Sequence, residues 1–517
     1  MADGCSAGPE AASDPMGGIE APLAEALAAP SAATFRQLAN SPPFGEYASE
    51  LLQFQKLSRH MQENSANGRR LMFLSAARMQ RSDCEGAKDA LRTAEALPSS
   101  EVIIGSELWA DREKRLRLCE AGNVSWFVQG FIGCRGFLEM LESGVLTPPM
   151  PTSLSIGIDD VDDERYLLGT IDAARELERY AVNRGQLLDL HSVQACLGAV
   201  QSLEQALMQF NFRNSDLRRR FDGVKYVVKK LETLAYEVDL AKKRGEAAGN
   251  ASKTDRQDVD SEGGEPLAKK RRAEAAPSSG SRPLAVDLKL LGAIKDRYDA
   301  FDSSRELAIK RSRDVIKSAK NAIFALQRDD LRKADGLLKQ CARDAESIYK
   351  ELVAGLPSLR GGSFSAALEE FAEALAYRAF RRDRTLLSRA AMQEASGLSF
   401  PLTLLEYLGG LMDLTGEVGR LAVRSASRGR QAVDEVSLCL ACVDAVYMGM
   451  QDLPFLPGGL GKKMGPLKGT LAKIEGILYE LALLSHGGIS VTAPACAVLE
   501  EECEGGGAGE KTADGTA

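Results

Sequence analysis

Histidine is almost absent from this sequence of 517 residues, in which His60, His191 and His486 are the only three. Zinc hydrolases use clustered histidine ligands, and ribonucleases that work by histidine acid–base catalysis need two imidazoles at one site. The sequence therefore disfavours both classes. Any hydrolytic chemistry must therefore rely on carboxylates.

Several other signatures are missing as well. No GxxxxGK[ST] phosphate loop and no GxGxxG between a strand and a helix occurs, which disfavours nucleotide-driven motor chemistry. No apolar run approaches the roughly 20 residues that cross a bilayer. Residues 1–30 lack the basic segment and compact apolar segment of a signal peptide. These absences predict an intracellular protein that has no membrane partner.

Cysteine provides no disulfide framework. The ten cysteines are scattered along the chain, many of them within apolar helical patterns, which is typical of reduced core thiols. Cys439 and Cys442 are the one close pair, and their spacing favours helix packing over a metal site.

What the sequence does contain is helical periodicity. Hydrophobic residues make up 44% of the chain, which excludes a wholly disordered protein, and apolar residues recur at spacings of three and four from residue 35 onward. Alternating patterns typical of strands are nearly missing, so we expect an all-α fold. The predicted helices of the first half span residues 87–95, 101–118, 126–142, 162–183, 192–208 and 217–242, and a second helical block spans 286–484.

Changes in composition divide the chain into five parts. We expect a disordered tail over residues 1–33, a helical domain over 34–244, a flexible linker over 245–284, a second helical domain over 285–486 and a disordered tail over 487–517. The linker carries a basic cluster, residues Lys269 to Arg272. Such a cluster is either a solvated charge run or a nuclear-import signal, and the second alternative predicts a protein of both nucleus and cytoplasm.

The two helical blocks are copies of one another. Residues 166–182 read YLLGTIDAARELERYAV and residues 407–423 read YLGGLMDLTGEVGRLAV, with eight of seventeen positions identical at an offset of 241. Residues 221–240 and 464–483 align at an offset of 243. A period this long indicates two paralogous domains, because solenoid units are about 20 to 50 residues long.

Acidic residues in the second block have helical spacing. Glu370 and Glu373 share a face at i, i+3, and Asp413 and Glu417 share one at i, i+4 on the next long helix. Four glycines lie near the second pair, at a cost of roughly 1 kcal/mol each relative to alanine. This cost suggests a close approach of backbones or room for a ligand. The glycines are Gly409, Gly410, Gly416 and Gly419.

Only the second block can gather four carboxylates. The first has Asp172 and Glu176 opposite Asp413 and Glu417, but Phe127 and Gly130 opposite Glu370 and Glu373. Four carboxylates brought together repel one another unless they are protonated or bridged by a cation, and oxygen ligands suit Mg²⁺ or Mn²⁺. The alternative is a set of solvated helix faces, or acids paired with Arg420 or Arg424.

The first block offers positive charge instead. One basic run lies on the predicted helix 101–118 and consists of Arg112, Lys114, Arg115 and Arg117. A second follows a helix cap formed by Asn214, Ser215 and Asp216; its members are Arg218, Arg219, Arg220, Lys225, Lys229 and Lys230. These residues could neutralise phosphates, or they could be solvated faces paired with nearby acids. The net charge of −8 argues against nonspecific coating of DNA.

Several segments carry a resemblance to the translin family. The first block resembles translin in DERYLLGTIDAARELERYAVN (163–183) and RNSDLRRRFDGVKYVVKKLETLAYEVDL (213–240). The second is similar to translin-associated factor X (TRAX) in KRSRDVIKSAKNAIFALQR (310–328), LEEFAEALAYRAFRRDRTLLS (368–388), YLGGLMDLTGEVGR (407–420) and LKGTLAKIEGILYEL (467–481). The resemblance implies two tandem translin-like helical bundles that are fused in one chain and self-associate into a hollow oligomer.

The resemblance also implies a function. The two family partners form a Mg²⁺-dependent endoribonuclease for single-stranded RNA, including nicked passenger strands of small RNA duplexes and fragments of tRNA precursors. The family's catalytic ExxE motif and following aspartate match Glu370, Glu373 and Asp413, and Glu417 matches a further acid, giving four expected ligands for Mg²⁺ or Mn²⁺. The first block would bind RNA, with Arg112 to Arg117 as the expected contacts. The alternative from another class is a non-catalytic protein that binds single-stranded RNA or DNA.

Overall fold

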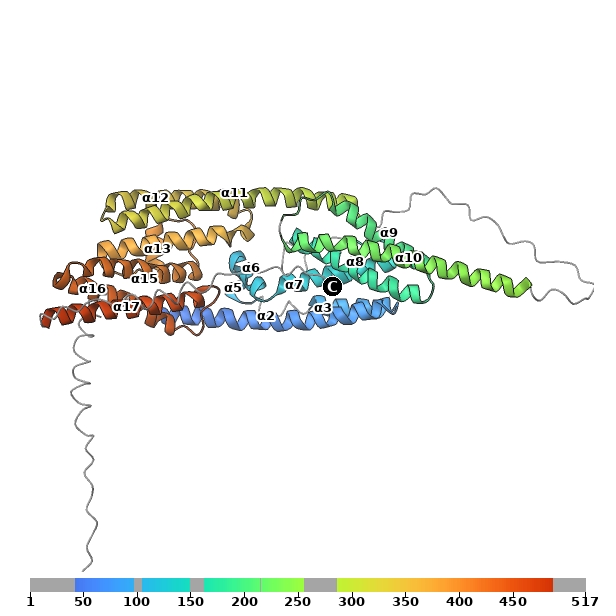
Figure 1. Ribbon diagram of the computed structural model, residues 1–517, viewed down its shortest axis with the longest axis horizontal. Helices are drawn as coiled ribbons and strands as arrows, with labels where there is room; N and C mark the ends of the chain where they lie inside the picture. Colours follow the sequence, from blue (N-terminus) through green and yellow to red (C-terminus); the bar gives the residue numbers. More distant parts are fainter. Residues whose placement is uncertain (1–41, 97–104, 149–161, 214, 255–285, 487–517) are drawn as a thin grey trace, which may run out of the picture. The chain divides into compact units, whose positions relative to one another are not determined.

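The computed structural model describes residues 42–96, 105–148, 162–213, 215–254 and 286–486, and within these ranges the regular elements are all helices (Figure 1). The predicted all-α fold is confirmed. None of the described helices is both long enough and apolar enough to span a bilayer. The two predicted tails and the basic cluster Lys269 to Arg272 lie outside the described residues.

The chain divides into two compact units. The N-terminal unit comprises residues 53–305, and the C-terminal unit comprises the chain from residue 306 onward together with the residues up to 52. The boundaries therefore fall inside two long helices, α2 (Phe44–Met79) and α11 (Leu288–Gln327).

The two units differ from the predicted domains at two segments. The start of α11 belongs to the N-terminal unit because Leu291 and Ile294 are buried in its core and Arg297 binds Asp163 there. The start of α2 belongs to the C-terminal unit, where the ring of Tyr47 packs at 5.5 Å against that of Tyr407.

The N-terminal unit is built around α8 (Asp163–Gln186), which packs against α7 (Val124–Ser143), α9 (Leu190–Leu207) and α10 (Asp216–Thr254). Its core is rich in aromatic residues, among them the fully buried Phe127, Phe137 and Tyr166. The described part of the unit also contains the rest of α2, the start of α11, α3 (Cys84–Ala96), α5 (Glu107–Ala110) and α6 (Arg112–Ala121).

Two predictions about helix ends in this unit need correction. The described part of the expected helix 101–118 is split into α5 and α6, because Asp111 lies between them in extended conformation and its side chain caps α6 through the amides of Glu113 and Lys114. The helix predicted over residues 217–242 also ends later than expected, since α10 continues through Gly245 to Thr254. One glycine costs a helix about 1 kcal/mol, which a long helix tolerates.

The C-terminal unit repeats this arrangement around α15 (Leu404–Ala426). It packs against α13 (Ser363–Asp383), α16 (Val433–Gln451) and α17 (Leu460–His486), just as α8 packs against α7, α9 and α10. The unit also contains the rest of α11, α12 (Leu331–Ile348), a π-turn (Tyr349–Val353), two 3₁₀ turns (Pro357–Arg360 and Gly429–Ala432) and α14 (Arg389–Ser396).

Residues at equivalent positions make equivalent contacts in the two units. Gly169 and Gly410 occupy matching positions, and at each a Cβ atom would come within 2.8 Å of a neighbouring helix. The hydroxyl groups of Tyr166 and Tyr407, also matched, donate to the carbonyls of Pro148 and Leu387. The duplication seen in the sequence is therefore a duplication of the packing.

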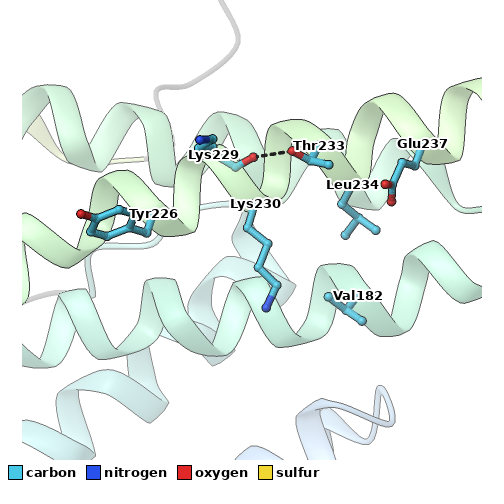
Figure 2. Close-up of a pocket in the computed structure, with 7 residues that line it drawn as sticks. All are labelled: Val182, Tyr226, Lys229, Lys230, Thr233, Leu234 and Glu237. Carbon is cyan, nitrogen blue, oxygen red and sulfur yellow. Dashed lines mark hydrogen bonds between the residues drawn. The ribbon is translucent and has the colours of Figure 1, made fainter. Parts of the chain in front are cut away.

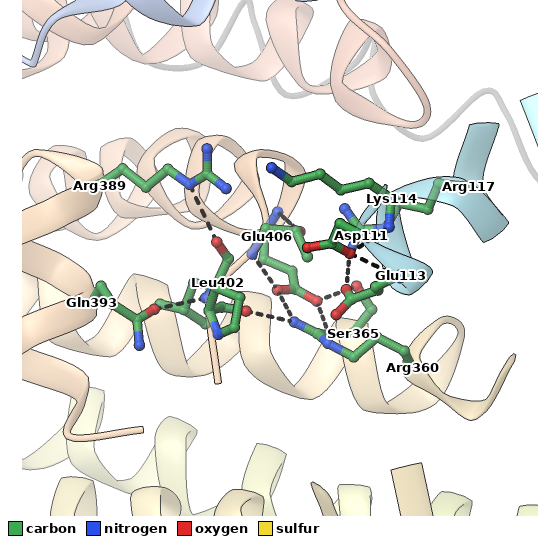
Figure 3. A network of polar contacts seen from close by, with 12 residues as sticks. Asp111, Glu113, Lys114, Arg117, Arg360, Ser365, Arg389, Gln393, Leu402 and Glu406 are labelled. Carbon is green, nitrogen blue, oxygen red and sulfur yellow. Dashed lines mark hydrogen bonds and ion pairs between the residues drawn. The ribbon is translucent and has the colours of Figure 1, made fainter. Parts of the chain in front are cut away.

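One buried ion pair fixes the start of α15. The guanidinium group of Arg360 binds both carboxylate oxygens of Glu406, and Ser365 donates to the same carboxylate at 2.6 Å (Figure 3). Glu406 also accepts from the backbone amide of Thr403, closing a capping box. With Arg360 3% exposed and Glu406 1% exposed, this network holds α13 and α15 in one relative position.

Five of the seven described cysteines are buried. All the described ones are free thiols, and Cys439 and Cys442 are buried in the packed face of α16. Burial raises the pKa of Cys439 to about 12 and that of Cys442 further, so both remain protonated and are poor metal ligands.

Candidate functional site

The predicted acidic residues lie where α13 crosses α15. The two helices approach closely because a Cβ atom at Gly410 would meet the backbone nitrogen of Glu373 at 2.8 Å, and one at Gly409 would meet the carboxylate of Glu369 at 2.5 Å. Gly419 likewise makes room for Thr470 of α17, whereas Gly416 faces open space. Three of the four glycines therefore have the predicted role.

Glu373 is at the centre of the cluster. Its residue is 8% exposed, and none of the described residues donates a hydrogen bond to its carboxylate. Burial, and then the charges of Asp413, Glu370 and Glu417, raise its pKa to about 8. The four predicted acids are thus electrostatic neighbours.

Asp413 is engaged by a protein cation. The ammonium group of Lys463, on α17, binds one oxygen of Asp413 and one oxygen of Glu369. Burial, the larger influence, raises the pKa of Glu369 although Lys463 lowers it. Lys463 and Glu369 were both absent from the predicted site.

Glu370 and Glu417 have polar partners as well. Glu370 pairs with Lys320 of α11 at 3.3 Å, with its side chain 27% exposed. Glu417 accepts from the side-chain amide of Gln327 and binds Arg420. The alternative of a pairing with Arg420 is therefore correct for Glu417, while Arg424 donates to the carbonyl of Gln327.

Mg²⁺ or Mn²⁺ can be tested against this donor set. Among the residues that the structure describes, no three histidine, cysteine, aspartate or glutamate side chains are arranged around a single ion position. The donors are nevertheless carboxylate oxygens, the ligands that these ions prefer, and the buried residue Glu373 has carboxylates as its charged neighbours. A complete set of ligands around one Mg²⁺ or Mn²⁺ ion would require neighbouring carboxylates to turn toward Glu373.

The N-terminal unit contains the same framework without the acids. Arg220, opposite Lys463 in the repeat, binds Asp172 at 2.8 Å, and the amide of Gln129 donates to the other oxygen of Asp172 at 2.6 Å. Where the C-terminal unit has Glu373, this unit has Gly130, which faces the side chain of Met72. Asp172 is thus bound entirely by protein groups.

The polar contacts of Glu417 are also duplicated. In the N-terminal unit Glu176, opposite Glu417, accepts from the side-chain amide of Gln80 at 3.1 Å. The sequences MQRSD (79–83) and LQRDD (326–330) place Gln80 opposite Gln327. Contacts present in both units stabilise the shared fold, so the distinguishing chemistry of the C-terminal unit resides in Glu369, Glu370 and Glu373.

The four predicted RNA contacts lie on α6 and differ in their exposure and in their pairing. Arg112 and Lys114 are exposed. Arg117 is paired with Glu113 on the same helix, and Arg115 donates to the carbonyl of Trp109 at 3.1 Å. By exposure, Arg112 and Lys114 are the more accessible of the four.

A second basic surface lies on α10. A shallow groove of about 360 Å³ runs between α8 and α10 (Figure 2), and Tyr226 in its lining is 66% exposed. The ammonium group of the neighbouring Lys225 lies 5.0 Å from the ring of Tyr226. Lys230 in the groove is paired with Glu178. The lining residues are Val182, Tyr226, Lys229, Lys230, Thr233, Leu234 and Glu237.

The Translin family model matches residues 111–242 and 303–484, which together are more than half of the chain. The chain belongs to the Translin family. Its two matched regions correspond to the two units of the duplication, one translin-like and one TRAX-like.

Known relatives represent both halves. Translin of Gallus gallus is 30% identical over 131 residues, covering 24% of this chain and 57% of the relative. The translin-associated protein X homolog of Schizosaccharomyces pombe is 26% identical over 205 residues, covering 37% of this chain and 86% of the relative. Translin-associated protein X of Mus musculus is 26% identical over 245 residues, covering 41% and 82%. The chain thus spans little more than half the length of the chicken translin that it matches.

Solved structures are similar at lower identity. Apo-NeC3PO has a TM-score of 0.33 and 18% identity, with 37% of this chain and 96% of that chain covered. AfC3PO has a TM-score of 0.32 and 19% identity, with 38% and 97% covered.

Proposed function

We propose that this protein is an endoribonuclease that uses Mg²⁺ or Mn²⁺ to cleave single-stranded RNA at the acidic cluster of the C-terminal unit. The observation that carries the proposal is Glu373, a carboxyl buried among three others, with no hydrogen-bond donor and a pKa of about 8. A group in this state is stabilised by a divalent cation, which offsets both the burial and the repulsion.

Each acid has a role in this proposal. Glu370 and Glu373 would hold the ion, and Asp413 would share its carboxylate between the ion and Lys463. Glu417, fixed by Gln327, would complete the set from the next turn of α15. When bound, a divalent ion polarises a phosphodiester oxygen and lowers the pKa of a water molecule.

The N-terminal unit would retain the RNA strand. Phosphates are bound by exposed cations, and α6 offers Arg112 and Lys114. Several copies of this chain would assemble into a hollow oligomer that encloses the strand, as the resemblance to the translin family implies. The proposed substrates are nicked passenger strands of small RNA duplexes and fragments of tRNA precursors.

A second function is favoured by a specific observation. The contacts of Asp413 with Lys463 and of Glu417 with Gln327 recur in the N-terminal unit as Asp172 with Arg220 and Glu176 with Gln80. Such contacts stabilise helix packing and need no catalysis. The alternative is therefore a non-catalytic protein that binds single-stranded RNA or DNA through its basic surfaces.

Cleavage of end-labelled single-stranded RNA separates the two functions. The nuclease proposal expects cleavage in Mg²⁺, none in chelator, and none by Glu373→Ala in either condition. Glu394→Ala, at an exposed acid of α14, is the matched control and should cleave normally. Binding without cleavage by the wild-type protein in Mg²⁺ would favour the alternative.

We also propose that the protein resides in both nucleus and cytoplasm through the basic cluster Lys269 to Arg272. Replacing these four residues with alanine in a fluorescent fusion should shift the protein toward the cytoplasm. An unchanged distribution would identify the cluster as a simple solvated charge run.

A further inference from the structure

Lys463 lies within the cluster of acidic side chains on α13 and α15. Its ammonium group lies between Glu369 of α13 and Asp413 of α15 and binds both, with the lysine side chain 28% exposed. The side chain thus bridges two helices through two ion pairs and places one positive charge between the two carboxylates.

The internal repeat indicates that this cation position belongs to the fold. In the N-terminal unit Arg220 takes the place of Lys463: it binds Asp172 at 2.8 Å and lies 5.7 Å from the ring of Trp126. Trp126 is opposite Glu369 in the alignment of the repeats. Each cation binds the aspartate of its central helix and one further carboxylate, which is Asp216 for Arg220, at 3.2 Å, and Glu369 for Lys463.

The charges of the cluster leave room for one divalent ion. Among the ion pairs of the described residues, three protein cations bind four of the five carboxylates, so two negative charges are uncompensated when all the groups are ionised. The cations are Lys320, Arg420 and Lys463, and the carboxylates are Glu369, Glu370, Glu373, Asp413 and Glu417. Among the described residues, Glu373 is the carboxyl of this set that has no ion pair, and its residue is 8% exposed.

Resting on the proposed function, we propose that Lys463 occupies the place of a second metal ion, so that the cluster binds a single divalent cation. In two-metal phosphodiester sites the ions lie about 3.5–4 Å apart and share carboxylates. Here Glu369 and Asp413, which could bridge to a second ion, are bound to the ammonium group instead. Lys463 is thus a residue that sets the metal stoichiometry of the site.

Counting bound Mn²⁺ in the full-length protein tests this assignment. The electron paramagnetic resonance signal of free Mn²⁺ gives the number of ions bound per chain. We expect one ion for the wild-type protein and for Lys463→Arg. We expect two for Lys463→Met, because Glu369 and Asp413 are then released. Arg220→Met, which removes the equivalent cation from the N-terminal unit, should still bind one.

The outcomes distinguish this inference from the function on which it rests. Two ions bound by the wild-type protein, or one bound by a folded Lys463→Met variant, would overturn the role of Lys463 and leave the metal site standing. No ion bound by the wild-type protein would overturn the metal site itself. Should Lys463→Met fail to fold, as judged by circular dichroism, Lys463→Gln replaces it, and the wild-type count remains decisive.

Discussion

The ammonium group of Lys463 binds the carboxylate of Asp413, and Arg220 binds Asp172 in the same way at the matching position of the other unit. The two units therefore share one structural connection between their central and last helices. They differ at three aligned positions of α7 and α13, which are Trp126, Phe127 and Gly130 in one unit and Glu369, Glu370 and Glu373 in the other. Glu373 and its counterpart Gly130 mark that difference.

The buried carboxyl of Glu373 should make stability depend on pH. Its folded-state pKa of about 8 lies above the usual 4.5, so the folded chain keeps a proton that the unfolded chain releases. The stabilisation is complete below pH 4.5 and is lost as pH rises toward 8. In chelator, the free energy of unfolding of the wild-type protein should fall across this window more steeply than that of Glu373→Gln.

Urea unfolding at pH 5, 6.5 and 8.5 measures this dependence. The control is Glu394→Gln, at the exposed acid of α14, which should keep the wild-type slope. Added Mg²⁺ should stabilise the wild-type protein most at pH 8.5, where Glu373 is most readily ionised. Parallel pH profiles for the wild-type protein and Glu373→Gln would contradict the buried position of this carboxyl.

Two glycines of α15 should respond oppositely to alanine. At Gly410 the new methyl group would lie 2.8 Å from Ala372 and from the backbone of Glu373, so Gly410→Ala should cost about 1–3 kcal/mol by overpacking. At Gly416 there is open space, and Gly416→Ala should stabilise by about 0.5–1 kcal/mol through helix propensity. Thermal unfolding of both variants tests the crossing of α13 and α15. Equal changes in stability for Gly410→Ala and Gly416→Ala would show that this crossing is misplaced.

The buried pair of Arg360 and Glu406 should be essential for stability. Glu406→Gln leaves the Arg360 guanidinium buried and uncompensated, which costs about 3–5 kcal/mol in comparable cases. The matched control is the exposed pair of Arg382 and Asp383, where Asp383→Asn should cost less than about 1 kcal/mol. Denaturant titration compares the two, and a small loss for Glu406→Gln would argue against the network of Figure 3.

The two basic surfaces can be separated by the salt dependence of RNA binding. Replacing Arg112 and Lys114 with alanine should weaken binding and reduce the slope of log K against log salt by about 1.4, since each single-strand phosphate contact contributes about 0.7. The same pair of substitutions at Lys225 and Lys229 of α10 is the comparison. Should only the α10 variant lose affinity, the groove of Figure 2 would replace α6 as the RNA contact.

Much of this architecture could be predicted from the sequence. Apolar spacing identified the helices, and the offset of 241 revealed the duplication because α8 and α15 keep the same buried face. Comparing the repeats also singled out Glu370 and Glu373. Helix ends were less predictable: no periodicity marks the extended Asp111 between α5 and α6, and the helical pattern tolerates Gly245.

The partners of the acids could not be predicted from local spacing. Lys463 is 50 residues from Asp413 and Lys320 is 50 residues from Glu370, so only the fold brings them together. A usable signal did exist for Lys463. At the offset of 243 it aligns with Arg220, the residue immediately before the aligned segment 221–240. A cation retained at matching positions of two repeats points to a shared ion pair.

The most direct test of the account is anomalous diffraction from crystals of the full-length protein grown with Mn²⁺. We predict one anomalous peak in the C-terminal unit, about 2–2.2 Å from a carboxylate oxygen of Glu373 and in contact with Glu370, with Lys463 still bound to Asp413. No peak should occur beside Asp172 in the N-terminal unit. Crystals grown at a saturating Mn²⁺ concentration that show no anomalous peak beside Glu373 would contradict the account.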